Sequence, residues 1–434
     1  GPQASIGEIR IRGNVRTRDK IVRREMELLP GDIYDSRKLA RSRSNMRRRG
    51  IFAKVATHEV PGEEPDTVDL EVEVEEARTG HIQIGGSVSP EDGSVGGGFS
   101  ISENNFDIRR WPHGWEDFAG GGAFRGAAQR LSLNANVTAS IKTVSLSFSD
   151  PWLWDTPAHY SFGTSLFYTD KDYDDYQDRR TGLSLRLGRR LFIRRFYGYL
   201  QYTLQEVYLD DLDPDLPADI LADEGTTLLS SLELGLSFDG RDNIFVPTRG
   251  VLVKGSQSIY GGPMGGDEDF RKTSLQAHVY VPLFRTLGYP HVLHIYGRGD
   301  MANPFNMDER IPVYERYFAG GVSTVRGYDY RSLSPHVGGE PVGGYFRLVE
   351  SAEYSFPLYQ DVLRGVLFFD AGYVWPEEGE LEWRDQRLSV GVGLLIKTPP
   401  HMGNMPIKLY FSEAINPRDE DDTQVFQMSF SLLF

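Results

Sequence analysis

The chain of 434 residues contains no cysteine, and this absence excludes a disulfide framework, a thiolate nucleophile and a metal site with Cys ligands. The chain also lacks any run of about eighteen or more apolar residues, the length that a membrane-spanning helix needs. The second absence excludes helical membrane proteins. It leaves open strand-built ones, whose apolar residues alternate with polar ones.

Catalytic and metal-binding patterns are missing as well. No Ser/His/Asp arrangement and no glycine-rich phosphate loop stands out, and His291 and His294 are three residues apart in a predicted strand. Residues three apart in a strand face opposite sides, so these two histidines cannot share a metal ion. We therefore expect a protein that is not an enzyme and that needs no cofactor or metal.

Charge is spread unevenly along the chain. Residues 1–50 hold fourteen Lys and Arg against six Asp and Glu, whereas the whole chain has a net charge of -15. A basic N-terminal part on an acidic body is not the pattern of a nucleic-acid-binding protein, so we expect no nucleic-acid partner. The basic face of the second predicted helix could bind an acidic accessory lipoprotein or an anionic lipid surface. The alternative is that this face is simply exposed to solvent.

The N-terminal part predicts a small α/β module. Residues 1–4, which begin with Gly-Pro and no methionine, are interpreted as a cleavage scar and linker. Residues 5–78 predict a strand, two helices and two further strands, the last with apolar and acidic residues in alternation. Thr17 is the expected N-cap of the first helix, and Asp35 or Ser36 that of the second.

From residue 79 to the C-terminus the hydrophobic pattern has a period of two. It marks about sixteen segments of roughly nine to fourteen residues, the length of membrane strands. Connections alternate between long acidic ones, such as 210–224, and short ones, such as 360–361. We therefore predict a mainly β protein with a sixteen-stranded antiparallel transmembrane β-barrel over residues 79–434. A soluble β-sandwich, which would also alternate, is the alternative.

The final segment shows this alternation most clearly. One face carries Phe426, Met428, Phe430, Leu432 and Phe434, and the other carries Gln427, Ser429 and Ser431. Aromatic side chains also gather near segment ends, as they do at membrane interfaces. Both features favour lipid contact over the core of a sandwich.

Two connections stand out by composition. Residues 104–129, on the side where turns should be short, hold Trp111, Trp115 and Phe118, and we expect this segment at the inner membrane surface. Residues 170–178 are acidic, which suits a solvated loop or a divalent-cation bridge to lipopolysaccharide.

A long loop predicted over residues 301–342 contains Gly320-Gly321-Val322-Ser323-Thr324-Val325-Arg326-Gly327-Tyr328. This stretch is either an ordinary exposed turn or a tip that folds into the barrel lumen. In the second case the charge of Arg326 needs a carboxylate, because an unpaired buried charge is very costly. The following strands offer Glu353 and Asp370.

The alternation of inward-facing and outward-facing residues along each strand indicates these two acids as the partners of Arg326. Leu367, Phe369, Ala371 and Tyr373 are expected to face lipid, so Asp370 should point inward. Glu350 has the opposite parity to Glu353, and we expect Glu353 inside. The alternative is that Arg326 and these acids form an ion pair in the lumen that does no more than stiffen the barrel.

Taken together, these motifs resemble the outer-membrane β-barrel assembly family of the BamA type, in which periplasmic POTRA modules precede a sixteen-stranded barrel. The resemblance runs from Ser5 onward. It rests on the βααββ order, Gly320-Gly321 with Val325-Arg326-Gly327-Tyr328, Phe369-Asp370-Ala371-Gly372, Asp239-Gly240-Arg241-Asp242 with Pro247-Thr248-Arg249-Gly250, Asp150-Pro151-Trp152 and the aromatic C-terminus. It implies a POTRA domain over residues 5–78, the last of several, and pairing of Arg326 with Glu353 and Asp370 in the lumen.

The resemblance also implies a function and a location. Such a protein folds and inserts other barrels into the outer membrane, with its POTRA domain in the periplasm. The implied partners are unfolded outer-membrane protein clients, assembly lipoproteins bound through the POTRA domain, and outer-membrane lipid and lipopolysaccharide. The alternatives are a TamA-type autotransporter assembly protein, a two-partner secretion transporter of the same superfamily and, less close, a passive porin.

The first and last strands suggest where a client binds. The first strand is short and contains Ile82, Ile84, Gly85 and Gly86, so its pairing with the last strand should be weak. An open strand edge templates another strand. Our hypothesis is that the terminal strand of a client pairs at this seam.

Overall fold

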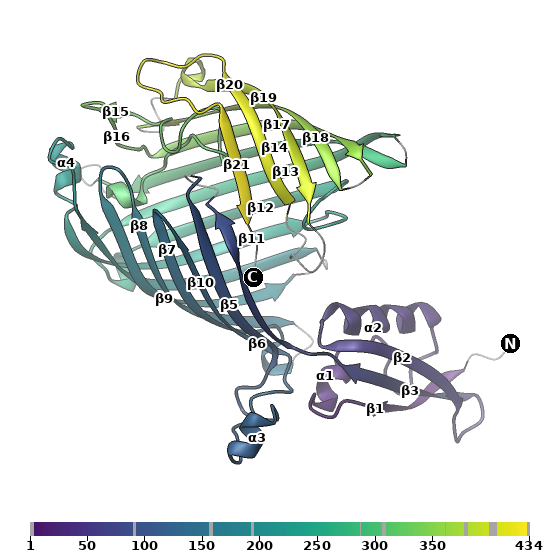
Figure 1. The fold of residues 1–434 in the computed structure, drawn as a ribbon. Helices are drawn as coiled ribbons and strands as arrows, with labels where there is room; N and C mark the ends of the chain where they lie inside the picture. Colours follow the sequence, from purple (N-terminus) through teal and green to yellow (C-terminus); the bar gives the residue numbers. More distant parts are fainter. Residues whose placement is uncertain are drawn as a thin grey trace. The chain divides into compact units, whose positions relative to one another are not determined.

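The computed structural model describes residues 4–89, 93–155, 159–191, 195–286, 288–305, 310–360, 362–376, 381–398 and 406–431 (Figure 1). The chain forms two compact units. One comprises Gly1–Gln83, Ser100–Leu133 and Leu146–Gly163, and the other comprises Ile84–Phe99, Asn134–Ser145 and Thr164–Phe434. Within the described ranges, no helix is long and apolar enough to cross a membrane.

The N-terminal module is a three-stranded sheet with two helices. Its elements are β1 (Ser5–Arg12), α1 (Asp19–Arg23), α2 (Ser36–Arg48), β2 (Phe52–Pro61) and β3 (Thr67–Glu76), in the predicted order. The central β3 pairs with β1 in parallel and with β2 in antiparallel. Ile21 of α1, Leu39 of α2 and Leu70 of β3 belong to one buried apolar cluster, which joins the helices to the sheet.

The two helices of the module begin differently. The carboxylate of Asp35 caps α2 as predicted, accepting hydrogen bonds of 2.8 and 3.3 Å from two backbone N–H groups of the first turn. The prediction of Thr17 as the cap of α1 is wrong. The helix begins at Asp19, and the buried hydroxyl of Thr17 instead accepts a hydrogen bond of 2.9 Å from the side chain of Asn105. A tertiary contact has replaced the expected local one.

Sixteen strands form one closed antiparallel barrel, so the predicted fold class is confirmed. Its strands are β4 (Gly80–Val88), β5 (Val95–Phe106), β6 (Gln129–Thr138), β7 (Ile141–Asp150), β8 (Tyr160–Asp172), β9 (Gln177–Arg190), β10 (Phe196–Asp210), β11 (Gly225–Asp239), β12 (Gly250–Tyr260), β13 (Phe270–Thr286), β14 (Tyr289–Pro304), β17 (Phe346–Tyr359), β18 (Leu363–Trp375), β19 (Arg387–Lys397), β20 (Pro406–Ala414) and β21 (Phe426–Ser431). Each strand neighbours the next along the chain, and β21 closes on β4, as the yellow and dark blue strands of Figure 1 show.

The two faces of the barrel wall differ as a membrane barrel requires. The paired Leu200 of β10 and Leu234 of β11 are 44% and 56% exposed. On the opposite face, the carboxylate of Glu233 accepts hydrogen bonds of 2.5 Å from Tyr199 and 3.0 Å from Ser258. Apolar residues outside and polar networks inside are the reverse of a soluble sandwich, whose core is apolar.

The connections carry the short elements. These are α3 (Trp115–Ala119), α4 (Ala218–Leu221), the hairpin β15 (His336–Val337) and β16 (Glu340–Pro341), and 3₁₀ turns at Leu153–Asp155, Gly262–Met264, Val313–Glu315 and Trp383–Asp385. Around α3, Trp111, Trp115 and Phe118 are 69%, 77% and 48% exposed. Their contact with a membrane surface stays a prediction.

One expectation about the barrel wall, the lipid-facing set of β18, is wrong in part. Leu367 and Phe369 are exposed as expected of lipid-facing residues, but Ala371 and Tyr373 are buried. Tyr373 packs under the guanidinium of Arg387, which lies 4.8 Å from its ring centre. Arg387 therefore covers Tyr373 near the C-terminal end of β18, where Tyr373 also packs against Trp375.

The acidic segment 170–178 is not simply a solvated loop. Asp170 is buried and forms a salt bridge of 3.1 Å with Lys142, and Asp178 is buried and forms one of 2.8 Å with Arg180. Cations of the barrel itself therefore neutralise these two carboxylates.

Candidate functional site

The loop between β14 and β17 runs inside the barrel. Glu315 forms salt bridges of 2.9 Å with Arg180 of β9 and 2.5 Å with Lys272 of β13. Slightly later, the carbonyl of Phe318 accepts a hydrogen bond of 2.8 Å from Arg347 of β17. These three strands are spread around the closed barrel, so one short segment reaches all of them only from the enclosed space.

Glycine residues let the loop approach the wall. Gly320, Gly321 and Gly327 have φ of 97°, 89° and 92°, a region in which other residues are strained. A Cβ atom on Gly327 would lie 3.2 Å from the side chain of Ser412 and 3.3 Å from that of Ser389. The backbone at Gly327 therefore fits against β19 and β20 because it has no side chain.

Arg326 is buried against the two predicted acids. Its Nε and Nη2 donate hydrogen bonds of 2.7 and 2.8 Å to the two oxygens of Asp370, and its backbone N–H donates a third of 3.1 Å. Nη1 donates a hydrogen bond of 2.9 Å to Glu353. Asp370 is fully buried and also accepts a hydrogen bond of 2.6 Å from Ser351. Two parallel hydrogen bonds between a guanidinium and a carboxylate are strong, and they fix the relative orientation of the two groups.

Aromatic rings complete the environment of Arg326. Its guanidinium carbon lies 3.6 Å from the ring centre of Phe368 and 4.5 Å from that of Tyr410. Each such cation–π contact stabilises a desolvated cation by about 1–2 kcal/mol. Strands β17, β18 and β20 thus hold one loop residue from three sides.

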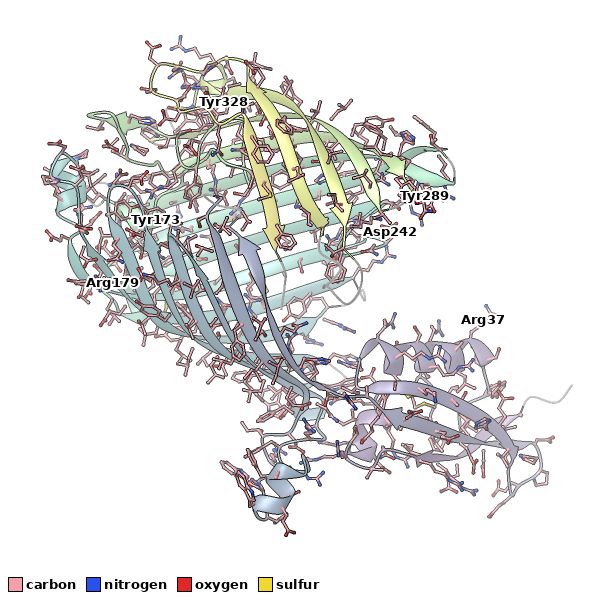
Figure 2. All side chains as sticks on the ribbon, in the orientation of Figure 1. Arg37, Tyr173, Arg179, Asp242, Tyr289 and Tyr328 are labelled. Atoms are coloured by element: carbon pink, nitrogen blue, oxygen red, sulfur yellow. The ribbon has the colours of Figure 1, made fainter. Side chains whose placement is uncertain are left out.

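The next residues of the motif contact the last strand. Tyr328, labelled in Figure 2, is fully buried, and its hydroxyl donates a hydrogen bond of 3.2 Å to the carbonyl of Leu388. The side chain of Gln427 on β21 accepts a hydrogen bond of 3.2 Å from the N–H of Gly327 and donates one of 2.8 Å to the carbonyl of Tyr328. Tyr328 also forms a backbone bridge with Thr423. The loop therefore pairs directly with the segment that leads into β21.

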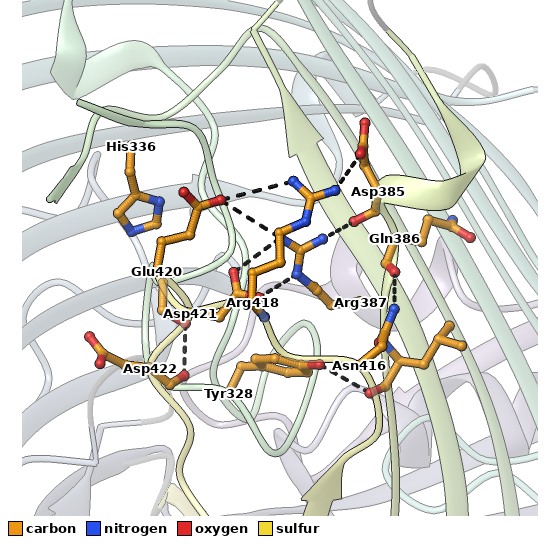
Figure 3. Close-up of polar contacts among 12 residues, drawn as sticks. Tyr328, His336, Asp385, Gln386, Arg387, Asn416, Arg418, Glu420, Asp421 and Asp422 are labelled. Carbon is orange, nitrogen blue, oxygen red and sulfur yellow. Dashed lines mark hydrogen bonds and ion pairs between the residues drawn. The ribbon is translucent and has the colours of Figure 1, made fainter. Parts of the chain in front are cut away.

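A polar network lies beside Tyr328 (Figure 3). Arg387 is buried and pairs with Asp421. Arg418 forms salt bridges of 2.5 Å with Asp385 and 3.9 Å with Glu420. These contacts join the connection before β19 to the connection before β21, next to the loop motif.

The described part of the seam between the last and first strands is short. Within the described residues, β21 and β4 share two residue pairs, Phe430 with Val88 and Ser431 with Ser87. By contrast, β10 and β11 share a continuous register of fourteen pairs from Phe196 to Leu209. Alternate pairs of an antiparallel ladder exchange backbone hydrogen bonds, so the described part of this junction holds far fewer of them than the junction of β10 and β11.

The predicted seam residues are placed as follows. Ile82 and Ile84 of β4 are 70% and 79% exposed, and Phe426 of β21 is 46% exposed. A Cβ atom on Gly86 would meet nothing closer than 3.8 Å, so packing does not require a glycine there. The remaining members are Gly85 of β4 and Met428 and Phe430 of β21, whereas Leu432 and Phe434 lie outside the described residues.

The turn between β11 and β12 is fixed by its own carboxylate. Asp242, labelled in Figure 2, accepts hydrogen bonds of 2.9 Å from the N–H of Thr248 and 3.2 Å from that of Arg249. Partial burial acts to raise the pKa of Asp242, but the bonds from Thr248 and Arg249 outweigh it and lower the pKa. The Asp-Gly-Arg-Asp motif at this turn is therefore a structural clamp.

Sequence reasoning missed several partners of the motif. The inward parity of Gln427 was visible in the alternation, but nothing local indicated its contact with Gly327 and Tyr328. The pair of Arg387 and Asp421 joins two connections and has no sequence signal. No group of three or more potential metal ligands is found among the described residues.

Comparison with known proteins agrees with this architecture. The Omp85 superfamily domain matches residues 123–434, and the surface antigen variable number repeat, a POTRA module, matches residues 4–77. The outer membrane protein assembly factor BamA of Nitratidesulfovibrio vulgaris is 29% identical over 432 residues, covering 99% of this chain and 51% of that protein. BamA of Neisseria meningitidis is 27% identical, covering 86% of this chain and 47% of that protein. The chain thus spans about half the length of these relatives.

Solved structures share the fold. The crystal structure of BamA from Haemophilus ducreyi lacking POTRA domains 1–3 has a TM-score of 0.78 at 21% identity, covering 99% of this chain and 84% of that chain. CdiB from Acinetobacter baumannii has a TM-score of 0.61 at 15% identity, covering 98% of this chain and 74% of that chain. With most of its length matched by the superfamily domain, the chain belongs to the Omp85 superfamily.

Proposed function

We propose that this protein is an assembly factor that folds client β-barrel proteins and inserts them into the outer membrane. The proposal places the barrel in that membrane and the POTRA module in the periplasm, and it assigns the protein no catalytic chemistry. It is supported by relatives over nearly the whole chain that are named outer membrane protein assembly factor BamA.

The observation that carries the proposal is the seam between β21 and β4, whose described part has two residue pairs. A strand with few ladder partners presents unpaired N–H and C=O groups, and such an edge accepts another strand. Strand addition gives a client main-chain hydrogen bonds that do not depend on its side chains. This suits a machine that handles many different barrels.

In this proposal the motif loop keeps the rest of the barrel in place while the seam opens. Arg326 is anchored on β17 and β18 through Glu353 and Asp370. The same loop holds β21 through Gln427 and the bridge to Thr423. The last strand is therefore restrained from the lumen while its pairing with β4 opens.

Accessory partners would bind the POTRA module. Its α2 helix presents the exposed Arg37, labelled in Figure 2, with further basic residues along the helix. Such a surface suits acidic lipoproteins of the assembly machinery or anionic lipid. Lipid and lipopolysaccharide would surround the exposed apolar face of the barrel.

A second candidate is a transporter of the same superfamily, with TamA-type autotransporter assembly as a close variant, since these candidates share the superfamily domain. A passive porin is a weaker candidate, because the loop that contacts β9, β13 and β17 occupies the lumen.

Reconstitution separates these candidates. The protein is placed in liposomes, an unfolded outer-membrane barrel is added, and folded, protease-resistant client is measured against empty liposomes. The assembly function predicts faster client insertion and little steady conductance. Insertion at the rate of empty liposomes, or a large client-independent conductance, would contradict it.

A further inference from the structure

A cavity of about 240 Å³ lies beside the lumen loop. The loop contributes Arg316, Ser323 and Arg331 to its lining, β17 contributes Arg347, and the connection between β8 and β9 contributes Tyr173. The described lining thus contains three arginines and no carboxylate, and none of its residues belongs to the seam.

Arg331 is buried in this lining, with 6% of its surface exposed. Its guanidinium carbon lies 3.7 Å from the ring centre of Phe318, 4.2 Å from that of Tyr173 and 5.1 Å from that of Tyr176. Nη2 donates a hydrogen bond of 2.6 Å to the hydroxyl of Tyr176. Within the described residues, neither Nε nor Nη1 has a hydrogen-bond acceptor, and no carboxylate pairs with Arg331.

Other arginines of the same region are paired. Arg316 forms a salt bridge of 2.9 Å with Asp219, and Arg347 forms one of 2.7 Å with Asp300. The aromatic cage around Arg331 offsets part of its lost hydration, but it supplies no acceptor for Nε or Nη1. A buried cation without an anion is costly, so this arrangement favours an anion in the cavity.

The backbone at Arg331 gives a second indication. Its φ of 67° lies in the left-handed region, which residues other than glycine seldom adopt. Strain of this kind persists where the surrounding structure holds it, and it is frequent at ligand-binding sites. Here it keeps the side chain of Arg331 within the cage rather than in solvent.

We infer that the cavity binds an oxyanion of the phosphate type, with Arg331 as its main cationic contact. A phosphoryl group has several strong acceptor oxygens for the free guanidinium N–H groups, and the hydroxyl of Ser323 is a further donor in the lining. Free phosphate and the phosphorylated sugar of a lipid headgroup share this chemistry. The site is independent of the proposed assembly function.

Calorimetric titration of the purified protein in detergent tests the inference. Inorganic phosphate and glucose 1-phosphate are titrated at constant ionic strength into the wild type, Arg331→Gln and the exposed control Arg384→Gln. Binding should be at least tenfold weaker in Arg331→Gln and unchanged in the control. Tighter binding of glucose 1-phosphate indicates a headgroup, and equal or tighter binding of phosphate indicates the free ion. No binding to the wild type, or equal binding to Arg331→Gln, overturns the site.

A second variant covers the case in which Arg331→Gln does not fold. Ser323→Asp places a carboxylate in the lining, and Ser323→Asn is its neutral control. The added acid should repel phosphate and pair with Arg331. We expect Ser323→Asp to lose phosphate binding and to unfold at a higher temperature than Ser323→Asn. Phosphate affinity equal to that of the wild type in Ser323→Asp overturns the inference.

Discussion

Gln427, on the last strand of the barrel, donates a hydrogen bond of 2.8 Å to the main-chain carbonyl of Tyr328 in the lumen loop. The same side chain accepts a hydrogen bond of 3.2 Å from the N–H of Gly327. The buried carboxamide thus joins the seam strand to the motif whose Arg326 is anchored on β17 and β18. The loop and the last strand form one connected structure inside the barrel.

Replacing Gln427 by alanine should loosen the last strand. The change removes the side-chain acceptor of the Gly327 N–H, and a buried unpaired group costs about 1–3 kcal/mol. The carbonyl of Tyr328 loses one hydrogen bond and keeps the one from the N–H of Gly321. Amide hydrogen exchange in residues 424–431 should become faster. Gln424→Ala is the matched control, because the exposed Gln424 contacts the loop through its backbone N–H. Equal exchange in the two variants would contradict the role of Gln427.

Asp370→Asn should destabilise the barrel strongly. Removing one charge of a buried ion pair costs about 3–5 kcal/mol, because the partner charge stays buried. Glu353→Gln should cost less, since Glu353 keeps 16% of its side chain exposed and accepts one bond from Arg326. The unfolding temperature in a heat-modifiability gel measures both effects. The exposed Glu350→Gln is the control, and an Asp370→Asn protein as stable as this control would refute the account of the network.

The hairpin β15–β16 should respond to pH through Glu340. A hydrogen bond with Asp175, together with burial, raises the pKa of Glu340 above its ordinary value. Since the folded-state pKa is the higher one, the stabilisation is complete below the unfolded-state pKa and is lost as pH rises through the folded-state pKa. After correction for intrinsic rates, amide exchange at 336–340 should be faster at about pH 8 than at about pH 5. Glu340→Gln should remove this difference; its persistence would point to another group.

Gly86→Val should strengthen the first strand and slow client insertion. The nearest atom to an added Cβ lies 3.8 Å away, so the side chain fits, and a β-branched residue favours extended backbone. The gain in stability should be about 1 kcal/mol or less. Gly297→Val in β14 is the control, since no described atom lies within 4 Å of a Cβ there and the site is far along the wall from the seam. Insertion slowed equally by both changes would argue against a special role of β4.

Much of the fold could be predicted because the alternation of apolar and polar residues in a strand is visible within a short stretch of sequence. Alternation along the chain predicts all sixteen barrel strands, and the parity of Glu353 and Asp370 together with the charge of Arg326 predicts the ion-pair cluster. Parity assigns a residue to a face, however, and does not identify what it contacts there. For this reason the contact of Gln427 with the loop could not be predicted.

The wrong predictions have the same physical origin. Thr17 has the composition and spacing of a helix cap, but its hydroxyl bonds to Asn105, which is far away in sequence. Tyr373 has the parity of a lipid-facing residue, but it is covered by Arg387. In both cases a contact between distant segments overrides a local preference, and a single sequence carries no record of such contacts.

The most direct test of the account is a disulfide across the seam. The chain has no cysteine, so Val88→Cys with Phe430→Cys introduces a single pair at registered positions of β4 and β21. Leu200→Cys with Leu234→Cys, at a registered pair of β10 and β11, is the control. Client insertion into liposomes is measured with each disulfide oxidised and then reduced. The account predicts that oxidation stops insertion only in the seam variant and that reduction restores it; undiminished insertion by the oxidised seam variant would contradict it.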